Sequence, residues 1–231
     1  MIGFYDYTVV LTFVSLLSTV FGMTQAMDGH FRTAIVCLAL SGLCDTFDGK
    51  IARTKKNRTS EEKLYGIQLD SLCDVVCFGV FPVMICYLLG LRGIVSLVAI
   101  GYYCICGVIR LGFFNVLETN RQNGCEAGEK VYHGLPITSI AVILPLTFLL
   151  SFAVSEQAFR VVLLVMLLVV ATLFIVDFKL QKPKNWVVMC LIAIVACAVV
   201  VIVLFSRNRV VRYHPPVSGP LIDELIGSAN E

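Results

Sequence analysis

Residues 41–53 read SGLCDTFDGKIAR, and residues 66–82 read GIQLDSLCDVVCFGVFP. The first stretch ends one apolar run and the second opens the next. Each stretch carries two aspartates at positions where a membrane-like sequence would not be expected to place a charge. They are Asp45, Asp48, Asp70 and Asp74. These two stretches decide the architecture. Their apolar runs predict membrane-spanning helices, and charged residues inside such helices usually have a function.

The composition extends this interpretation to the whole chain. Of its 231 residues, 58% are hydrophobic and 15% are charged, whereas a soluble domain is about half apolar and about a quarter charged. A helix needs about 20 residues to cross the hydrocarbon core. We expect spans at about 7–26, 30–52, 67–89, 94–117, 136–154, 158–177 and 185–206. The predicted fold is all-α, a polytopic transmembrane helix bundle of six to seven spans, with one domain over residues 1–212 and a flexible tail over 213–231.

Most of the ten cysteines are expected to be free thiols. Most lie inside apolar runs, where cysteine packs as a small hydrophobic side chain. Cys104 and Cys106 are two residues apart, which places them on different faces of a helix and argues against a metal pair.

Lysines and arginines gather in alternate connections, and this predicts the orientation. They are Arg53, Lys55, Lys56, Arg58 and Lys63 after the second span, Arg121 and Lys130 after the fourth, and Lys179, Lys182 and Lys184 after the sixth. The positive-inside rule makes these connections cytoplasmic. With seven spans, however, Arg207, Arg209 and Arg212 would lie outside. Either one apolar run does not cross, or the tail is a tolerated exception.

The spacing of the aspartates predicts that they meet. Asp45 and Asp48 share one helix face, and so do Asp70 and Asp74. The two spans are joined on the cytoplasmic side, so they run antiparallel and their carboxylates can converge there. An ionised group at mid-bilayer costs about 2.5–3.5 kcal/mol, and converging carboxylates repel unless cations bind among them. Oxygen-only ligands favour Mg²⁺ or Mn²⁺, and two such ions suit phosphoryl transfer.

Small residues beside the aspartates provide a second, weaker indication. Gly49, Ala52 and Gly66 leave room for a nucleotide to approach the backbone, although small residues are equally common where membrane helices pack closely. Arg53 either binds a phosphate or extends its charge to the interface. For the carboxylates, the competing interpretations are a structural network or the ion site of a transporter. Residues 116–231 do not repeat the aspartate pattern, as related transporter halves would.

In order, the spacing is Asp-x2-Asp-Gly-x2-Ala-Arg over residues 45–53, followed by Gly-x3-Asp-x3-Asp over residues 66–74. This series resembles the signature of the CDP-alcohol phosphatidyltransferase family. The gap of twelve residues between Arg53 and Gly66 is longer than is usual in the family, an extension that costs little in a loop. The branch that makes phosphatidylserine is similar in three segments: QLDSLCDVVCFGVFP at 68–82, YYCICGVIRLGFFN at 102–115 and HGLPIT at 133–138.

The resemblance implies a role for each signature residue. Asp45, Asp48 and Asp70 would hold the metal ions, and Asp74 would complete the metal site and act as the general base. The CDP moiety would be contacted by Asp45, Gly49, Ala52, Arg53 and Gly66. A homodimer is also implied.

Four further residues are candidates for binding the substrate phosphate or the serine. Arg110 and Asn115 are expected at the depth of the aspartates, where they bind the donor phosphate or the serine carboxylate, or simply reach the interface. Lys130 and His133 are expected in the next cytoplasmic connection, near the mouth of the site.

We therefore expect a metal-dependent enzyme of the cell membrane, with its active site facing the cytoplasm. Its substrates would be CDP-diacylglycerol and L-serine, and it would bind no nucleic acid. Alternatives are an acceptor such as glycerol phosphate or inositol phosphate, an archaeal-type ether lipid donor, and, from another class, a carboxylate-based cation transporter.

Overall fold

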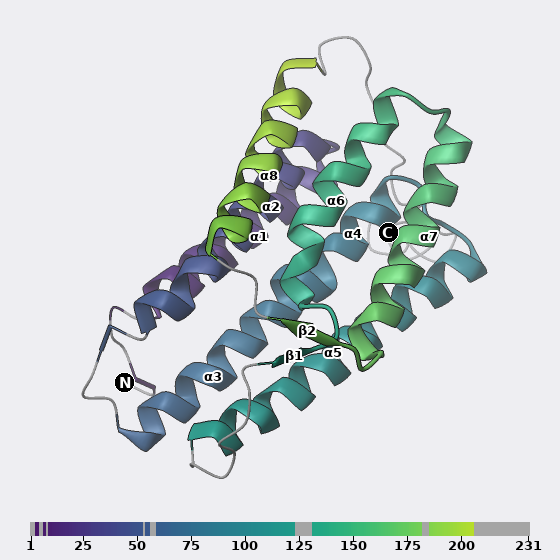
Figure 1. The fold of residues 1–231 in the computed structure, drawn as a ribbon. Coiled ribbons are helices and arrows are strands. Elements are labelled where there is room, and N and C mark those ends of the chain that lie inside the picture. Colours follow the sequence, from purple (N-terminus) through teal and green to yellow (C-terminus); the bar gives the residue numbers. More distant parts are fainter. Residues whose placement is uncertain are drawn as a thin grey trace, which may run out of the picture.

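A computed structural model of the chain describes residues 3–4, 7, 9–52, 54–55, 59–122, 131–181 and 185–205. These residues form a bundle of helices (Figure 1). The α-helices are α1 Val10–Met27, α2 Phe31–Ala52, α3 Ser60–Asp74, α4 Phe81–Leu88, α5 Ile94–Gln122, α6 Ile140–Leu149, α7 Glu156–Ile175 and α8 Asn185–Phe205. Three short turns extend them: the π-helical η1 Val75–Val80 and the 3₁₀ turns η2 Ile137–Ser139 and η3 Leu150–Phe152.

Each apolar run expected to span the membrane is helical, and five helices are long and apolar enough to cross one. They are 10–27, 60–88, 94–121, 156–175 and 186–204. Helix α2 has 22 residues, but it carries the charges of Arg32, Asp45, Asp48 and Lys50. Residues 137–152 form a shorter apolar helix. The all-helical membrane bundle is therefore confirmed, and the tail expected at 213–231 lies outside the described residues.

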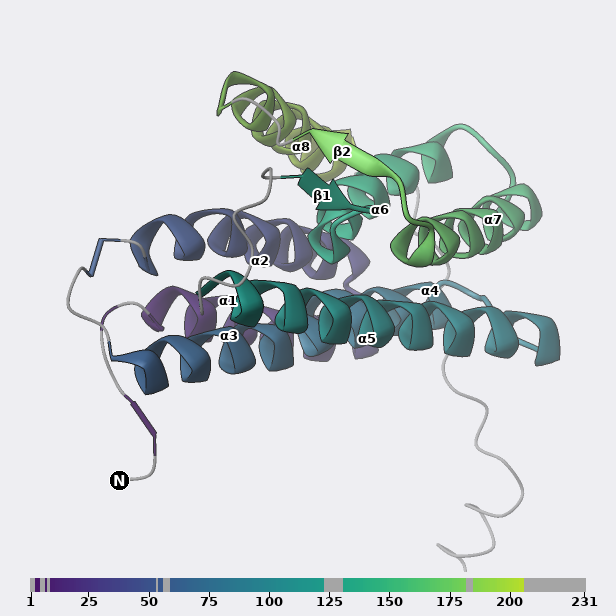
Figure 2. The same ribbon diagram turned by 60° about the horizontal axis from the view of Figure 1, so that its bottom comes forward.

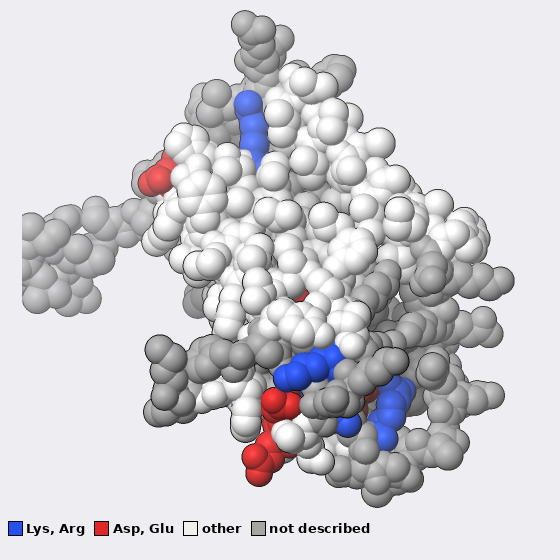
Figure 3. Space-filling model, turned by 90° about the vertical axis from the view of Figure 1, so that its left-hand side faces the viewer, with Lys and Arg blue, Asp and Glu red and all other residues white. Residues whose placement is uncertain are grey.

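Charge is distributed as a membrane protein requires. Figure 3 shows described lysines, arginines, aspartates and glutamates gathered at the lower end of the molecule and a few at the upper end, with a broad, largely uncharged belt between them. Many large apolar side chains are exposed, for example Ile94 at 83% and Leu204 at 68%. Such exposure suits contact with lipid rather than with water.

Helices α1 and α2 are joined by hydroxyl groups and a close backbone approach. The Thr19 and Ser41 hydroxyls are 2.9 Å apart, and Ser41 Oγ donates to the Ser15 carbonyl oxygen at 3.0 Å. A Cβ added at Gly22 would lie 2.5 Å from the Phe81 ring and 2.7 Å from Cys37 Cβ. Small residues and hydroxyls serve this purpose in bilayers, where apolar burial alone cannot drive helices together.

The second aspartate pair lies on a helix that continues without a break through α3, η1 and α4. Figure 2 shows this helix running beside α5, with α6, α7 and α8 on one side of these two helices. In Figure 1 the C-terminal end of α2, the N-terminal end of α3 and the C-terminal end of α5 all lie at the lower left. Asp45 and Asp48 lie in the last two turns of α2 near this end, and Asp70 and Asp74 lie in the last two turns of α3, deeper in the bundle.

Two short strands, which the sequence pattern did not predict, tie two connections together. Strand β1, Val131–His133, pairs antiparallel with β2, Lys179–Gln181, and His133 is opposite Lys179. The pairing links the segment before η2 to the segment after α7. All cysteines in the described part of the chain are free thiols, as expected.

Candidate active site

The first pair of carboxylates lies in the last two turns of α2. Asp48 is buried, with 7% of its surface exposed. Its Oδ2 accepts a hydrogen bond from Thr12 Oγ1 of α1 at 3.3 Å. Asp48 lies three residues after Asp45 on the same face of α2. Helix α1 therefore holds the Asp48 carboxylate in place through Thr12.

The second pair depends on where α3 begins. The Glu62 N–H donates to Thr59 Oγ1 at 3.1 Å, and the Thr59 N–H donates to Glu62 Oε2 at 2.9 Å. This capping box sets the first turn of the helix, and Lys55 Nζ holds Glu62 Oε1 at 3.2 Å. From that start, Asp70 and Asp74 fall one turn apart on one face.

The two pairs converge as the spacing predicted. One oxygen from each of Asp45, Asp70 and Asp74 can be chosen so that all lie within 4.8 Å of one another. Asp48, one turn after Asp45 on α2, is outside this group of three and is not among the residues that line the cavity. The donor set consists of hard oxygens, which suits Mg²⁺ or Mn²⁺, and the mutual repulsion of the three carboxylates gives a cation a reason to bind. The residues therefore fit the expected metal site.

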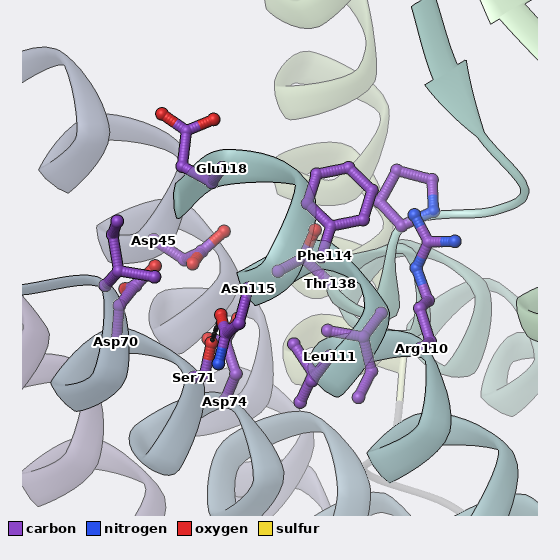
Figure 4. Close-up of a pocket in the computed structure, with 13 residues that line it drawn as sticks. Asp45, Asp70, Ser71, Asp74, Arg110, Leu111, Phe114, Asn115, Glu118 and Thr138 are labelled. Atoms are coloured by element: carbon purple, nitrogen blue, oxygen red, sulfur yellow. Dashed lines mark hydrogen bonds between the residues drawn. The ribbon is translucent and has the colours of Figure 1, made fainter. Parts of the chain in front are cut away.

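The Asp45, Asp70 and Asp74 carboxylates line one side of a cavity of about 200 Å³. Figure 4 shows Asp45 and Asp70 on one side and Arg110 on the other, with Asn115 and Asp74 between them. The remaining lining comes from α3, α5 and the turn at η2. It comprises Ile67, Ser71, Leu111, Phe114, Glu118, Pro136, Ile137 and Thr138.

Arg110 lies on the wall opposite the aspartates and is held from two sides. It is 6% exposed, its guanidinium carbon is 5.0 Å from the centre of the Phe114 ring, and Nη1 donates to the Phe174 carbonyl oxygen at 3.5 Å. A guanidinium that stacks on an aromatic ring and donates to a carbonyl at a helix end is held in one orientation, in which it can bind an anionic group. Arg110 lines the same cavity as Asp45, Asp70 and Asp74, in agreement with the expectation that it lies at the depth of the aspartates.

Asn115 is fixed by the helix that carries the second aspartate pair. Its Oδ1 accepts from Ser71 Oγ at 2.6 Å. This bond occupies the side-chain carbonyl and leaves the amide NH₂ as the group with donors to offer. It also joins α5 to α3 within one turn of Asp74.

The HGLP segment shapes the far wall through its backbone. Gly134 has φ +67, and its N–H donates to the Phe178 carbonyl oxygen at 2.9 Å. A Cβ there would lie 3.0 Å from Arg110 Nη1 and from the Val176 carbonyl oxygen. Only glycine accepts both that φ and that approach without strain. The segment therefore packs against Arg110 and leads into Pro136 at the cavity.

The structure gives less information about the residues expected to contact CDP and about Lys130 and His133. Gly49 lies in α2, and a Cβ added to it would meet nothing within 4 Å. Gly66 lies in α3 and Ala52 ends α2. His133 is in β1, but its side chain, like Arg53 and Lys130 in full, lies outside the described residues.

Sequence reasoning missed several polar residues at the site: Thr12, Ser71, Glu118 and Thr138. Glu118 had a recognisable signal, because Leu111, Asn115 and Glu118 follow the i, i+4, i+7 spacing of one helix face. Glu118 also pairs with Arg121, whose Nη1 is 3.0 Å from Oε2. Thr12 and Thr138 are far from the aspartates in sequence, and only the packing of the helices brings them near.

Comparison with known proteins agrees with the geometry. The sequence model that matches residues 7–173 describes CDP-alcohol phosphatidyltransferase. A CDP-diacylglycerol–serine O-phosphatidyltransferase of Saccharomyces cerevisiae is 32% identical over 149 residues, which are 62% of this chain and 52% of the yeast protein. An archaetidylserine synthase of Methanothermobacter thermautotrophicus is 28% identical over 165 residues, covering 71% of this chain and 66% of the relative. A protein of Methanocaldococcus jannaschii with the same name as the yeast relative is 26% identical over 189 residues, 82% of each chain.

Proposed function

Because the chain belongs to the CDP-alcohol phosphatidyltransferase family, we propose that it transfers a phosphatidyl group from CDP-diacylglycerol to L-serine and releases CMP. The observation that carries this proposal is the convergence of the Asp45, Asp70 and Asp74 carboxylates on a cavity that also contains Arg110 and Asn115. The names of the yeast and M. jannaschii relatives support serine as the acceptor.

In the proposed reaction, Asp74 accepts the proton of the serine hydroxyl. The serine oxygen then forms a bond to the phosphorus that bears the diacylglycerol, while the bond from that phosphorus to the CMP oxygen breaks. CMP leaves with the electron pair of that bond. A base within hydrogen-bonding reach of the nucleophile typically contributes about 10²–10⁴ in rate.

Two Mg²⁺ or Mn²⁺ ions held by Asp45, Asp48, Asp70 and Asp74 would neutralise phosphate charge at this site. The Thr12 hydroxyl would keep Asp48 in position, because it donates a hydrogen bond to Asp48 Oδ2. The capping box at Thr59 and Glu62 in turn sets the turn of α3 on which the second pair lies.

Two sets of residues would bind the substrates. Asp45, Gly49, Ala52, Arg53 and Gly66 would contact the CDP moiety, and the open space at Gly49 agrees with a ligand passing close to the backbone. Arg110, Asn115, Lys130 and His133 would bind the donor phosphate or the serine. The stacked, tethered guanidinium of Arg110 is suited to a carboxylate or a phosphate.

A second donor is favoured by one specific observation. The M. thermautotrophicus relative is named for archaetidylserine synthesis, so an ether lipid linked to CDP is the alternative donor. Glycerol phosphate and inositol phosphate are the alternative acceptors.

The test is CMP release by the purified full-length protein in detergent or liposomes. CDP-diacylglycerol and CDP-archaeol are each offered with L-serine, glycerol 3-phosphate, inositol phosphate or no acceptor, with Mn²⁺ or Mg²⁺. Serine-dependent release that EDTA abolishes supports the proposal. Release with another acceptor assigns a related transferase activity. If no combination of donor and acceptor releases CMP, the cation-transporter interpretation is favoured instead.

We also propose a homodimer in the cell membrane with the site on the cytoplasmic side. Light scattering of the detergent-purified protein tests the dimer. The orientation is tested below.

A further inference from the structure

A π-helical turn follows directly after Asp74. Turn η1 covers Val75–Val80, and the Phe81 N–H bonds to the Val76 carbonyl oxygen five residues earlier. π-turns inside α-helices are uncommon and often occur at functional sites. Here the turn lies immediately after the residue proposed as the general base.

Pro82 lies two residues after the π-turn, in the first turn of α4. Pro82 has no backbone N–H, so it cannot donate the α-helical hydrogen bond to the carbonyl of Phe78, four residues earlier. A buried carbonyl must find another donor or lose the free energy of its bond to water.

Tyr103 of α5 supplies a donor. Its hydroxyl donates to the Phe78 carbonyl oxygen at 2.8 Å, and both residues are 0% exposed. The Tyr103 ring also packs on Phe174, with 5.4 Å between ring centres. The tyrosine is therefore fixed on one side and bonded to the π-turn on the other.

A second hydrogen bond joins the same two helices on the other side of Asp74. Ser71, three residues before Asp74, donates to Asn115 of α5 at 2.6 Å. Phe78, four residues after Asp74, accepts from Tyr103 of α5. Asp74 thus lies between two points at which its helix is bonded to α5.

We propose that Tyr103 is a positioning residue for Asp74: its hydroxyl holds the π-turn through the Phe78 carbonyl, and this keeps the Asp74 carboxylate beside Asp45 and Asp70. Tyr103 touches neither the substrates nor the carboxylates in this role. The proposal rests on the proposed function for its effect on turnover, but its effect on cation binding can be measured independently.

The first test is Tyr103→Phe in the full-length protein, with Tyr102→Phe as the matched control. Tyr102 is the preceding residue of the same helix, and its hydroxyl lies 3.4 Å from Thr172 Oγ1 rather than near the π-turn. The measurements are kcat, KM for serine and for the CDP-lipid, the Mn²⁺ activation curve, and Mn²⁺ binding by electron paramagnetic resonance.

For Tyr103→Phe we expect kcat to fall and the Mn²⁺ concentration for half-activation to rise, each by roughly tenfold, the scale for groups that orient metal ligands. Both KM values should change much less, and Tyr102→Phe should resemble the wild type. Unchanged kcat and Mn²⁺ binding in Tyr103→Phe would overturn the proposal, even with a lower Tm, because a merely structural hydroxyl predicts that pattern.

A double-mutant cycle with Pro82→Ala tests the route through the carbonyl. Alanine restores the N–H at position 82, which can then donate to Phe78, so Tyr103→Phe should cost far less in that background. Non-additive effects support the proposal, and additive effects overturn it. Should Tyr103→Phe fail to accumulate alone, Pro82→Ala and the double variant are compared directly.

The same experiments separate this inference from the proposed function. If the wild type releases no CMP with any acceptor, the proposed function fails. Mn²⁺ binding by Tyr103→Phe then still decides the positioning role.

Discussion

At the scale of single residues, the convergence of Asp45, Asp70 and Asp74 within 4.8 Å leads us to expect that the proposed metal site needs each carboxylate. Asp70→Asn keeps the shape and removes the charge, so turnover should fall by at least about 100-fold, the upper end of the loss when even an outer-shell partner is removed. The Mn²⁺ needed for activation should rise. CMP release across a Mn²⁺ titration measures both.

Asp28→Asn is the control for this substitution. Asp28 is exposed at the opposite end of α1, and its neutralisation should leave turnover and the Mn²⁺ dependence as they are. Substantial activity in Asp70→Asn, at ordinary Mn²⁺ concentration, would remove Asp70 from the metal site.

Gly49 allows the proposed nucleotide contact to be tested apart from folding. A Cβ there meets no protein atom within 4 Å, and alanine favours a helix over glycine by up to about 1 kcal/mol. Gly49→Ala should therefore keep or raise the Tm, while KM for the CDP-lipid rises severalfold because the methyl group enters the ligand's space.

Gly101→Ala is the matched control, since a Cβ there also meets nothing within 4 Å and the residue does not line the cavity. It should leave KM unchanged. An unchanged KM in Gly49→Ala as well would remove Gly49 from the CDP site.

At the scale of elements, the apolar runs predicted every described long helix, because a bilayer sets the length of an apolar helix directly. The same pattern missed η1, β1 and β2. Three-residue strands have no periodicity to detect. Pro82 stands in the sequence, but a helix can end, bend or form a π-turn near a proline, and the sequence pattern does not distinguish these outcomes.

The packing of α1 against α2 and α4 depends on a missing side chain. A Cβ at Gly22 would lie 2.5 Å from the Phe81 ring and 2.7 Å from Cys37 Cβ, so Gly22→Ala forces these helices apart. We expect a loss of roughly 1–3 kcal/mol, the usual cost of overpacking. Thermal unfolding in detergent measures it.

Gly101→Ala serves as the control here too, because it adds the same methyl group to open space. It should be as stable as the wild type or slightly more so. Equal stability of Gly22→Ala and Gly101→Ala would mean that α1 can move without cost.

At the scale of the whole molecule, the Asp45, Asp70 and Asp74 carboxylates lie close enough together to repel one another until cations bind. Mn²⁺ should therefore raise the Tm of the wild type, since a ligand at 100 times its Kd stabilises a single site by about 2.7 kcal/mol. Unfolding with EDTA and with Mn²⁺, at equal ionic strength, measures the difference. The rise should shrink in Asp70→Asn, and an equal rise in that variant would place the cation elsewhere.

Orientation is also a property of the whole molecule. The site lies at the end where Lys55 and Glu62 pair and where charge gathers (Figure 3), which we propose is cytoplasmic. Sealed inside-out vesicles should release CMP when serine and Mn²⁺ are added outside. Right-side-out vesicles should do so only after permeabilisation, and the reverse result would invert the topology.

The sequence by itself determined that the chain is a bundle of membrane helices, where the apolar runs lie and which aspartates stand out, although α3 begins at Ser60 rather than 67 and α5 ends at Gln122 rather than 117. Each of these depends on local pattern: run length against bilayer thickness, or spacing against the 3.6-residue turn. The spacing also predicted that the two pairs could meet.

Only the tertiary structure decided what surrounds them. The bonds from Thr12 to Asp48, Ser71 to Asn115 and Tyr103 to Phe78 join residues 36, 44 and 25 positions apart. Whether such residues meet depends on how each helix is rotated and crossed against its neighbours. That rotation is set by the packing of all the helices together, so no single stretch of sequence contains it.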